Sequence, residues 1–322
     1  MNILLTGAGG ASAISVWKSL AKDHTIYMCD MDPNAAGLYL VPPAQRSLSL
    51  PGDAPDFVNK MLDLCQKDKI DLLIPTVDSE LAPLAAHDQA FKDIGTIIPL
   101  SPYLTLKNCF DKYLLLNLCK DTAPVPDFHL VMEDVSSLKI SFPCFAKPRV
   151  GAGSRGCVKI TDPNDFARLP RDGSYLIQEL LPGEEYSVDV YIHSSGRPLA
   201  AVPRLRMKID SGIAVTARSV FFPELQRTAL SIAKVMNIKY AANIQFKASA
   251  DNIFKLLEIN PRFPGTLPLT TASGIDMPKL LIKDINNEEL PEHLMPFKET
   301  MMVRYWTEHF LPFSEWMELC QN

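Results

Sequence analysis

The segment 255–265, Lys-Leu-Leu-Glu-Ile-Asn-Pro-Arg-Phe-Pro-Gly, limits the fold of this chain more than any other stretch. Its apolar residues predict a strand, and its two prolines end that strand. Because side chains alternate along a strand, Glu258 and Asn260 share one face, followed by the fixed positive charge of Arg262. Oxygen donors of this kind suit a hard divalent ion such as Mg²⁺. A plain strand end with a polar turn accounts for these residues equally well.

The composition is that of a globular chain. Its 322 residues are 47% hydrophobic and 21% charged, enough for two or three subdomains with their own cores. The net charge of -5 gives no basic field for nucleic acid or a membrane surface. The seven cysteines contain no CxxC pair, which favours a reducing, cytoplasmic location. No apolar run approaches the ~18 residues that cross a membrane.

The first hundred residues have a βαβ pattern. A strand at 2–6 leads into a glycine turn, Gly7 to Ser12, then a helix to Leu20 and a second strand that ends at Asp30. Such a turn can hold an anion on free backbone amides. It also resembles a dinucleotide fingerprint, although Ser12 stands where a third glycine or alanine is expected. The pattern of the first residues predicts a buried strand and not a signal peptide.

Polar residues follow the next predicted strand, at 70–74. Asp78 and Glu80 lie where the carboxyl ends of parallel strands bind ligands, so they are candidates for contacting a substrate. Helix capping by Asp78 or Ser79 is the alternative. A further strand at 95–98 closes this unit, and a boundary is expected near residue 103.

Two lysines and a glycine-rich loop follow. Lys112 lies near the first turns of a predicted helix, and Lys147 faces away from the apolar residues of a strand at 143–148. The loop 151–156 holds three glycines between two strands. Its backbone amides can surround phosphate oxygens, or it is a mobile hairpin in solvent.

The segment 175–192 reads as two strands joined by a kink at Pro182. Leucines, backbone donors and acceptors, and a carboxylate at Glu185 are what an adenine and a ribose require. Further on, strands at 242–246 and 254–260 form a hairpin that brings Gln245 beside Glu258.

In this order, the motifs resemble the ATP-grasp superfamily, most closely the single-unit, carbamoyl-phosphate-synthase-like carboxylate-amine ligases. The resemblance extends to about residue 285. It implies an α/β N-terminal Rossmann-like (pre-ATP-grasp) domain, followed by an α+β ATP-grasp domain whose two subdomains clasp ATP. The expected divisions are the Rossmann-like domain at 1–103, the small lid subdomain at 104–177, and the C-terminal subdomain with the metal site at 178–322.

The resemblance also implies roles for individual residues. Lys112 and Lys147 would bind the ATP phosphates, and Glu185 the ribose. Lys147 and Arg262 would act in catalysis by offsetting charge on the transferring phosphoryl group. The remaining ATP contacts would come from the lid residues Gly151, Gly153 and Ser154 and from the adenine hinge, Gln178, Glu179, Leu180 and Leu181. The metal ligands would be Glu258, Asn260 and Gln245, and the neutral Gln245 favours one ion over two.

The implied activity is an ADP-forming ligase that joins a small carboxylic acid, an amino acid for preference, to an amine through an acyl phosphate. Its cofactors would be ATP and one or two Mg²⁺ ions, with Mn²⁺ as a substitute. Its partners would be small substrates, with no nucleic acid and no membrane, and a homodimer stays open. A dinucleotide-dependent oxidoreductase and a non-catalytic ATP-binding subunit are the alternatives.

Substrate selection is expected from segments without a general code: the Gly7 turn, residues 78–80, residues 204–218 and residues 265–271. Arg204, Arg206 or Arg218 would hold a substrate carboxylate, or would form surface ion pairs. The segment after residue 285, with Trp306, is expected to be an extension with an aromatic packing role.

Overall fold

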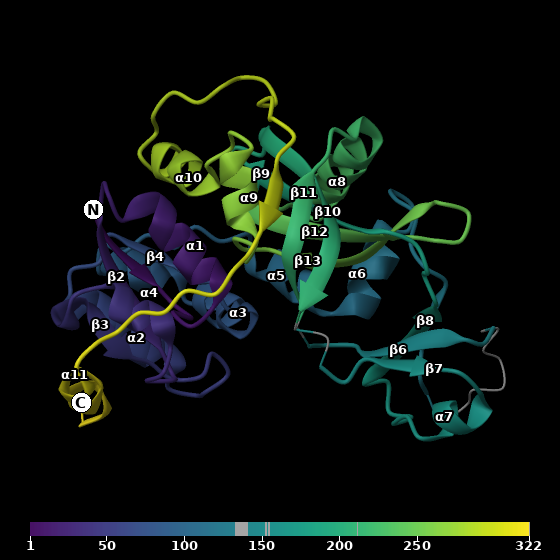
Figure 1. Cartoon of the computed structure of the whole chain (residues 1–322), viewed down its shortest axis with the longest axis horizontal. Helices are drawn as coiled ribbons and strands as arrows, with labels where there is room; N and C mark the ends of the chain where they lie inside the picture. Colours follow the sequence, from purple (N-terminus) through teal and green to yellow (C-terminus); the bar gives the residue numbers. More distant parts are fainter. Residues whose placement is uncertain (133–140, 152, 154, 211, 322) are drawn as a thin grey trace.

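Three β-sheets organise the chain, and each is a separate body in Figure 1. The computed structural model describes residues 1–132, 141–151, 153, 155–210 and 212–321. Within these ranges no helix is long and apolar enough to cross a membrane.

The first sheet is parallel, with the strand order β3-β2-β1-β4. Its strands are short and apolar, and alternate residues face opposite layers of helices, as a parallel sheet requires. Ile3 and Leu5 join the core against α1, while Leu4 joins the core against α2. The elements are β1 (Asn2–Leu5), α1 (Ala11–Leu20), β2 (Thr25–Asp30), two 3-10 turns (Ala36–Leu40 and Pro43–Gln45), β3 (Arg46–Leu48), α2 (Phe57–Lys67), β4 (Leu72–Ile74), α3 (Asp78–Ala86) and α4 (Asp88–Asp93).

The second sheet is antiparallel and small, with the order β5-β8-β6-β7. We call it the lid sheet. Its core consists of five buried residues: Val131, Cys144, Ala146, Ile160 and Ile177. Its elements are β5 (Phe128–Leu130), β6 (Cys144–Pro148), β7 (Val158–Ile160), α7 (Pro163–Ala167) and β8 (Tyr175–Glu179).

The third sheet is antiparallel, with six strands in the order β13-β12-β9-β10-β11-β14. We call it the main sheet. Its elements are β9 (Glu185–Ile192), β10 (Pro198–Asp210), β11 (Ile213–Ser219), α8 (Pro223–Val235), β12 (Tyr240–Ala248), β13 (Phe254–Asn260), α9 (Leu267–Ala272), α10 (Met277–Ile285), β14 (Met301–Val303) and α11 (Phe313–Gln321).

The two faces of the main sheet differ in chemistry because its strands alternate. One face is apolar and packs against α8 and against α6 (Lys112–Cys119), which follows α5 (Tyr103–Phe110). The other face carries polar side chains from β9, β10, β12 and β13 and forms the site described below. The helices α5 and α6 fall inside the predicted stretch 104–177, yet their buried residues Cys109, Leu115, Leu116 and Cys119 pack with the main sheet. The predicted domain limits remain predictions.

The α/β fold class expected from the sequence is confirmed, and several local expectations are corrected. The stretch 95–98 forms only a parallel bridge between Ile97 and Leu72. Val77 precedes α3 without a side-chain cap, so neither Asp78 nor Ser79 is the N-cap. The aromatic packing role after residue 285 is wrong, because Trp306 is 89% exposed.

Candidate active site

The hairpin of β12 and β13 builds the floor of the site. Gln245 lies directly opposite Glu258, and Asn243 lies opposite Asn260. The Asn260 amide donates to the Glu258 carboxylate over 3.2 Å. The sequence prediction that these side chains meet is therefore confirmed. Among the described residues no three His, Cys, Asp or Glu side chains cluster, so a metal ion here would depend on one carboxylate and neighbouring amide oxygens.

Two buried lysines approach this floor from the lid side. Lys147 on β6 is 5% exposed, and its ammonium donates to the Leu257 carbonyl on β13 over 3.3 Å. Burial lowers the pKa of Lys147 to about 8, and the neighbouring Glu258 partly opposes this. Lys112, at the start of α6, donates to the Gly151 carbonyl over 2.6 Å. Each of these two ammonium groups thus donates to a backbone carbonyl.

Lys112 is fixed by its neighbour Asp111. The Asp111 carboxylate accepts hydrogen bonds from the amides of Tyr113 and Leu114, which caps α6, and also from Arg149 over 2.8 Å. The Lys112 amide donates to the Arg149 carbonyl over 3.0 Å. The start of α6 is thereby tied to the end of β6.

The glycine-rich loop rises from the end of β6. Gly151, Gly153 and Gly156 have φ values of 149°, 67° and 72°, which favour glycine. A Cβ placed on Gly212 would lie 3.8 Å from the Cα of Gly153, so the loop approaches the β10–β11 turn. Ser154 lies outside the described residues, and its predicted role stays untested.

The expected adenine hinge joins the lid sheet to the main sheet. Gln178 is 3% exposed, and its side-chain oxygen has no hydrogen-bond partner among the described residues. The Glu179 side chain is held by Lys255 and by the Asp127 amide, and the Glu179 backbone amide itself donates to the Asp127 carbonyl over 3.0 Å. After Leu180 and the buried Leu181, Gly183 approaches Ala248 so closely that a Cβ would lie 2.6 Å from the Ala248 Cβ.

Arg206 was the residue whose partners the sequence could not predict. It contacts Glu185 and Gln245 over 2.8 Å each, and the Gly212 carbonyl over 2.7 Å. It therefore orients the predicted ribose and metal ligands together. Arg204 is 1% exposed and pairs with Asp189, so it is not a surface ion pair. The signal for Asp189 was a lone carboxylate in the apolar run 188–192.

Arg262 connects the main sheet to the N-terminal domain. Its guanidinium donates two hydrogen bonds to the Asp78 carboxylate, over 2.7 and 2.8 Å. Glu80, two residues further along α3, is 5% exposed and accepts a hydrogen bond from Thr6. Burial raises the pKa of Glu80 to about 7. The two candidate substrate contacts thus lie at the domain junction, beside the predicted catalytic arginine.

The glycine turn of the N-terminal domain reaches the same junction. The Ser12 hydroxyl donates to the Phe263 carbonyl over 2.6 Å. Asp30 accepts from the Gly9 amide over 2.8 Å and from the Asp32 amide over 3.0 Å. A dinucleotide site would need this carboxylate for a ribose, so its engagement within its own loop disfavours the oxidoreductase alternative.

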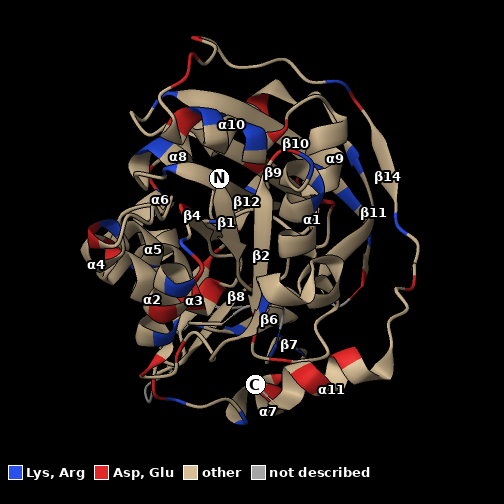
Figure 2. Ribbon diagram, turned by 90° about the vertical axis from the view of Figure 1, so that its left-hand side faces the viewer, with Lys and Arg blue, Asp and Glu red and all other residues tan. Residues whose placement is uncertain are grey.

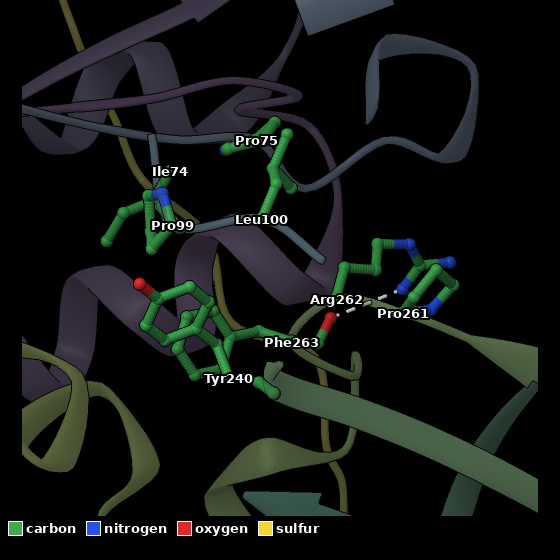
Figure 3. A pocket seen from close by; sticks show the side chains of 9 residues that line it. Ile74, Pro75, Pro99, Leu100, Tyr240, Pro261, Arg262 and Phe263 are labelled. Atoms are coloured by element: carbon green, nitrogen blue, oxygen red, sulfur yellow. Dashed lines mark hydrogen bonds between the residues drawn. The ribbon is translucent and has the colours of Figure 1, made fainter. Parts of the chain in front are cut away.

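Beside Arg262 the two domains meet in a packed seam. Figure 3 shows Pro75, Pro99 and Leu100 facing Tyr240 and Phe263 across it. The enclosed space is about 10 Å³, room for a single water at most. A space of this size leaves no room for a substrate in this seam.

A small antiparallel lid sheet joined to a larger antiparallel sheet, behind a Rossmann-like domain, is the arrangement that defines the ATP-grasp class. Two family models match: "ATP-grasp in the biosynthetic pathway with Ter operon" over residues 172–309, and "PylC-like, N-terminal domain" over residues 3–99. The chain belongs to the ATP-grasp superfamily.

Curated relatives match over part of their length. The D-alanine–D-alanine ligase of Thermotoga sp. (strain RQ2) is 31% identical over 105 residues, which is 31% of this chain and 35% of the ligase. The carbamoyl phosphate synthase large chain of Thermoanaerobacter sp. (strain X514) is 26% identical over 191 residues, 52% of this chain and 17% of the synthase. The chain therefore spans well under half the length of either relative.

Solved structures match nearly the whole fold. N5-carboxyaminoimidazole synthetase from Staphylococcus aureus, complexed with ADP, has a TM-score of 0.75 at 16% identity and covers 94% of this chain and 82% of that one. The biotin carboxylase domain of Hydrogenobacter thermophilus 2-oxoglutarate carboxylase, in complex with MgADP and bicarbonate, has a TM-score of 0.74 at 15% identity, over 92% and 72%. At these identities the likeness establishes the fold alone.

Proposed function

We propose that the protein is an ADP-forming ligase that activates a small carboxylic acid with ATP and joins it to an amine. The observation that carries the proposal is the approach of Lys147 to the strand of Glu258, over 3.3 Å to the Leu257 carbonyl. A buried ammonium beside a metal-type carboxylate is the arrangement that a triphosphate and its cation require. The superfamily and its ligase relatives support the same reaction type.

The residues fit Mg-ATP in their chemistry. Lys112 and Lys147 are buried cations whose hydrogen-bond acceptors are carbonyls, so phosphate oxygens would be better partners. The unpartnered oxygen of Gln178 can accept from an exocyclic amine in the hinge. Glu258, Asn260 and Gln245 would hold one Mg²⁺ ion, and a second ion would have to share Glu258. Mn²⁺ would substitute because it also takes oxygen ligands.

The proposed reaction depends mainly on positioning and electrostatics. A carboxylate oxygen of the acid attacks the γ-phosphorus of ATP, the bond to the β-phosphate oxygen breaks, and ADP leaves. The amine then attacks the acyl phosphate, loses a proton and expels inorganic phosphate. Bound Mg²⁺ would supply neutralising charge at the phosphate oxygens. Lys147 and Arg262 would offset the remaining charge, and the 151–156 loop would exclude water from the acyl phosphate.

Amino acids are the proposed acids because the D-alanine ligase relative acts on an amino acid.

A cytoplasmic location is proposed from the thiols, since five of the seven free cysteines are buried, as in proteins of a reducing compartment. Homodimer formation remains a prediction from the sequence.

The test is substrate-dependent release of ADP and phosphate from ATP and Mg²⁺, across a panel of amino acids and small carboxylates with an amine. We expect Glu258→Ala to lower turnover by at least about 100-fold, the scale of losing a preorganised charge contact. Glu224→Ala is the matched control, because Glu224 is an exposed carboxylate on α8, which packs against the apolar face of the main sheet. Equal turnover by Glu258→Ala and wild type would refute the metal assignment.

A further inference from the structure

Arg304 extends the polar face of the main sheet beyond the predicted site. Its amide donates to the Val215 carbonyl over 2.9 Å, so it continues β14 by one residue along β11. Side chains alternate, so Arg304 shares the face of Met302, which packs against Ala217 and Leu269. Ala217 in turn pairs with Arg206, the residue that binds Gln245. Figure 2 shows β14 beside β11 and α9 on the outer edge of the molecule.

The Arg304 side chain ends at the turn that follows Arg262. Its guanidinium donates to the Gly265 carbonyl. From the opposite direction, the guanidinium of Arg204 donates to the hydroxyl of Thr266. Two positive groups therefore bind consecutive residues of one turn, and that turn begins three residues beyond Arg262.

Of the two guanidinium groups, Arg204 has a carboxylate partner and Arg304 has none among the described residues. Asp189 contacts Arg204 over 2.5 Å, with both side chains at most 1% exposed. Within the described residues no carboxylate lies within 4.0 Å of Arg304, whereas Arg262 has Asp78 and Arg206 has Glu185. Burial and the nearby charge of Arg204 lower the pKa of Arg304. An anion would offset this unmatched charge.

A third positive feature lies against the same turn. A Cβ on Gly265 would be 3.3 Å from the Ala11 Cβ and 3.9 Å from the Ser12 amide, so the turn touches the beginning of α1. That helix has no side-chain cap and no acidic residue in its first turn. Its dipole therefore adds to the positive potential at Gly265, while the Asp30 carboxylate offsets part of it by accepting from the Gly9 amide just before the helix.

We propose that Arg304 binds an anionic group of the acid substrate at the Gly265 turn, as a specificity residue of the proposed ligase. Only one of the five N–H donors of its guanidinium has a partner among the described residues, and the fork geometry suits a carboxylate or a phosphate. The subsite lies at the turn three residues beyond Arg262, whereas Lys112 and Lys147 contact Gly151 and Leu257. The inference rests on the proposed function, which supplies the acid.

The experiment measures anion binding to protein saturated with Mg²⁺ and a non-hydrolysable ATP analogue, which fills the sites of Lys112 and Lys147. The probes are acetate, succinate and inorganic phosphate, titrated by calorimetry. We expect wild type to bind at least one probe. The affinity of Arg304→Gln for that probe should be lower by about tenfold or more. The Arg304→Lys variant keeps the charge but loses the fork, so intermediate affinity is expected. A preference for carboxylates or for phosphate identifies the anion.

The matched control is Arg227→Gln. Arg227 is exposed on α8, which packs against the apolar face of the main sheet, so the substitution removes the same charge from the opposite side of the sheet. It should bind the probe as wild type does, and nucleotide affinity should stay within about twofold in all three variants. Wild-type protein that binds none of the probes, or equal binding by Arg304→Gln, would overturn the inference. If wild-type protein does not bind the ATP analogue with Mg²⁺, that result would instead overturn the proposed function.

Discussion

Lys147 is the residue whose surroundings have the clearest chemical consequence. Burial lowers its pKa to about 8, while Glu258 nearby favours the charged form. Since the folded-state pKa lies below that of an unfolded lysine, the buried charge costs stability below about pH 8, and the cost is relieved as the pH rises further. A bound triphosphate would reverse the effect by stabilising the ammonium.

We therefore expect proton uptake when Mg-ADP binds above pH 8. In the free protein Lys147 has lost its proton at pH 9, and phosphate binding restores it, so affinity should fall by up to tenfold per pH unit above about pH 8. Calorimetry in two buffers of different ionisation enthalpy, at pH 6.5 and pH 9, measures the uptake. Lys147→Arg keeps its charge throughout and is the control, so uptake at pH 9 should vanish in it. Buffer-independent enthalpies for wild type at pH 9 would contradict the expectation.

At the residue scale, the sequence predicted the contacts that follow from the two-residue alternation of side chains along a strand. The strand alternation of Glu258 and Asn260, and the hairpin that brings Gln245 to them, follow from spacing within one segment. The pairing of Arg262 with Asp78 joins positions 184 residues apart, and no local pattern encodes it. Arg304 was hidden for the same reason, since its position depends on how β14 joins an edge strand.

At the scale of elements, the start of α6 determines where Lys112 lies. The sequence indicated a helix across 107–116, but the chain breaks at Asp111, which has φ -85° and ψ 99° and caps a new helix. Its carboxylate serves both the cap and Arg149. The sequence could not reveal this break, because no glycine or proline marks it and apolar residues continue on both sides.

Asp111→Ala should destabilise the protein and weaken nucleotide binding together. Loss of the cap costs about 1 kcal/mol, and leaving Arg149 unpaired adds roughly 1–2 kcal/mol. Urea unfolding measures the stability, and Mg-ADP titration measures the affinity, which should fall because Lys112 loses its anchor.

The matched control is Asp162→Ala, which removes an N-cap of the same kind from α7, where Asp162 accepts from Asn164 and Asp165. That cap is exposed and not tied to either lysine, so stability should fall by about 1 kcal/mol while Mg-ADP affinity stays unchanged. Unchanged affinity in Asp111→Ala as well would show that Lys112 does not bind the phosphates.

At the scale of the whole molecule, the fold class was predictable because a short sequence motif marks each domain. A glycine turn follows the first strand of the N-terminal domain, and prolines follow the strand of Glu258. The path of the segment after β14 could not be predicted from the sequence. After β14 the chain crosses to the N-terminal domain, where α11 binds Arg46 through Glu315 and Asn34 through Trp316 (Figure 1). Long-range packing decides that path, and the exposed aromatic residues before α11 gave a misleading signal.

The small core of the lid sheet has a consequence for how the molecule opens. Among the described residues, the buried core of that sheet has five members, whereas the core around the main sheet contains Tyr186, Val188, Ile244, Phe246 and many others. A unit with so little apolar burial should unfold locally at a lower free energy than the rest. In hydrogen–deuterium exchange, the amides of β6 and β8 should therefore exchange faster than those of β9 and β12. Mg-ADP should slow β6 and β8 selectively, since it would bridge both sheets, and uniform rates in all four strands would show that the sheets unfold as one cooperative unit.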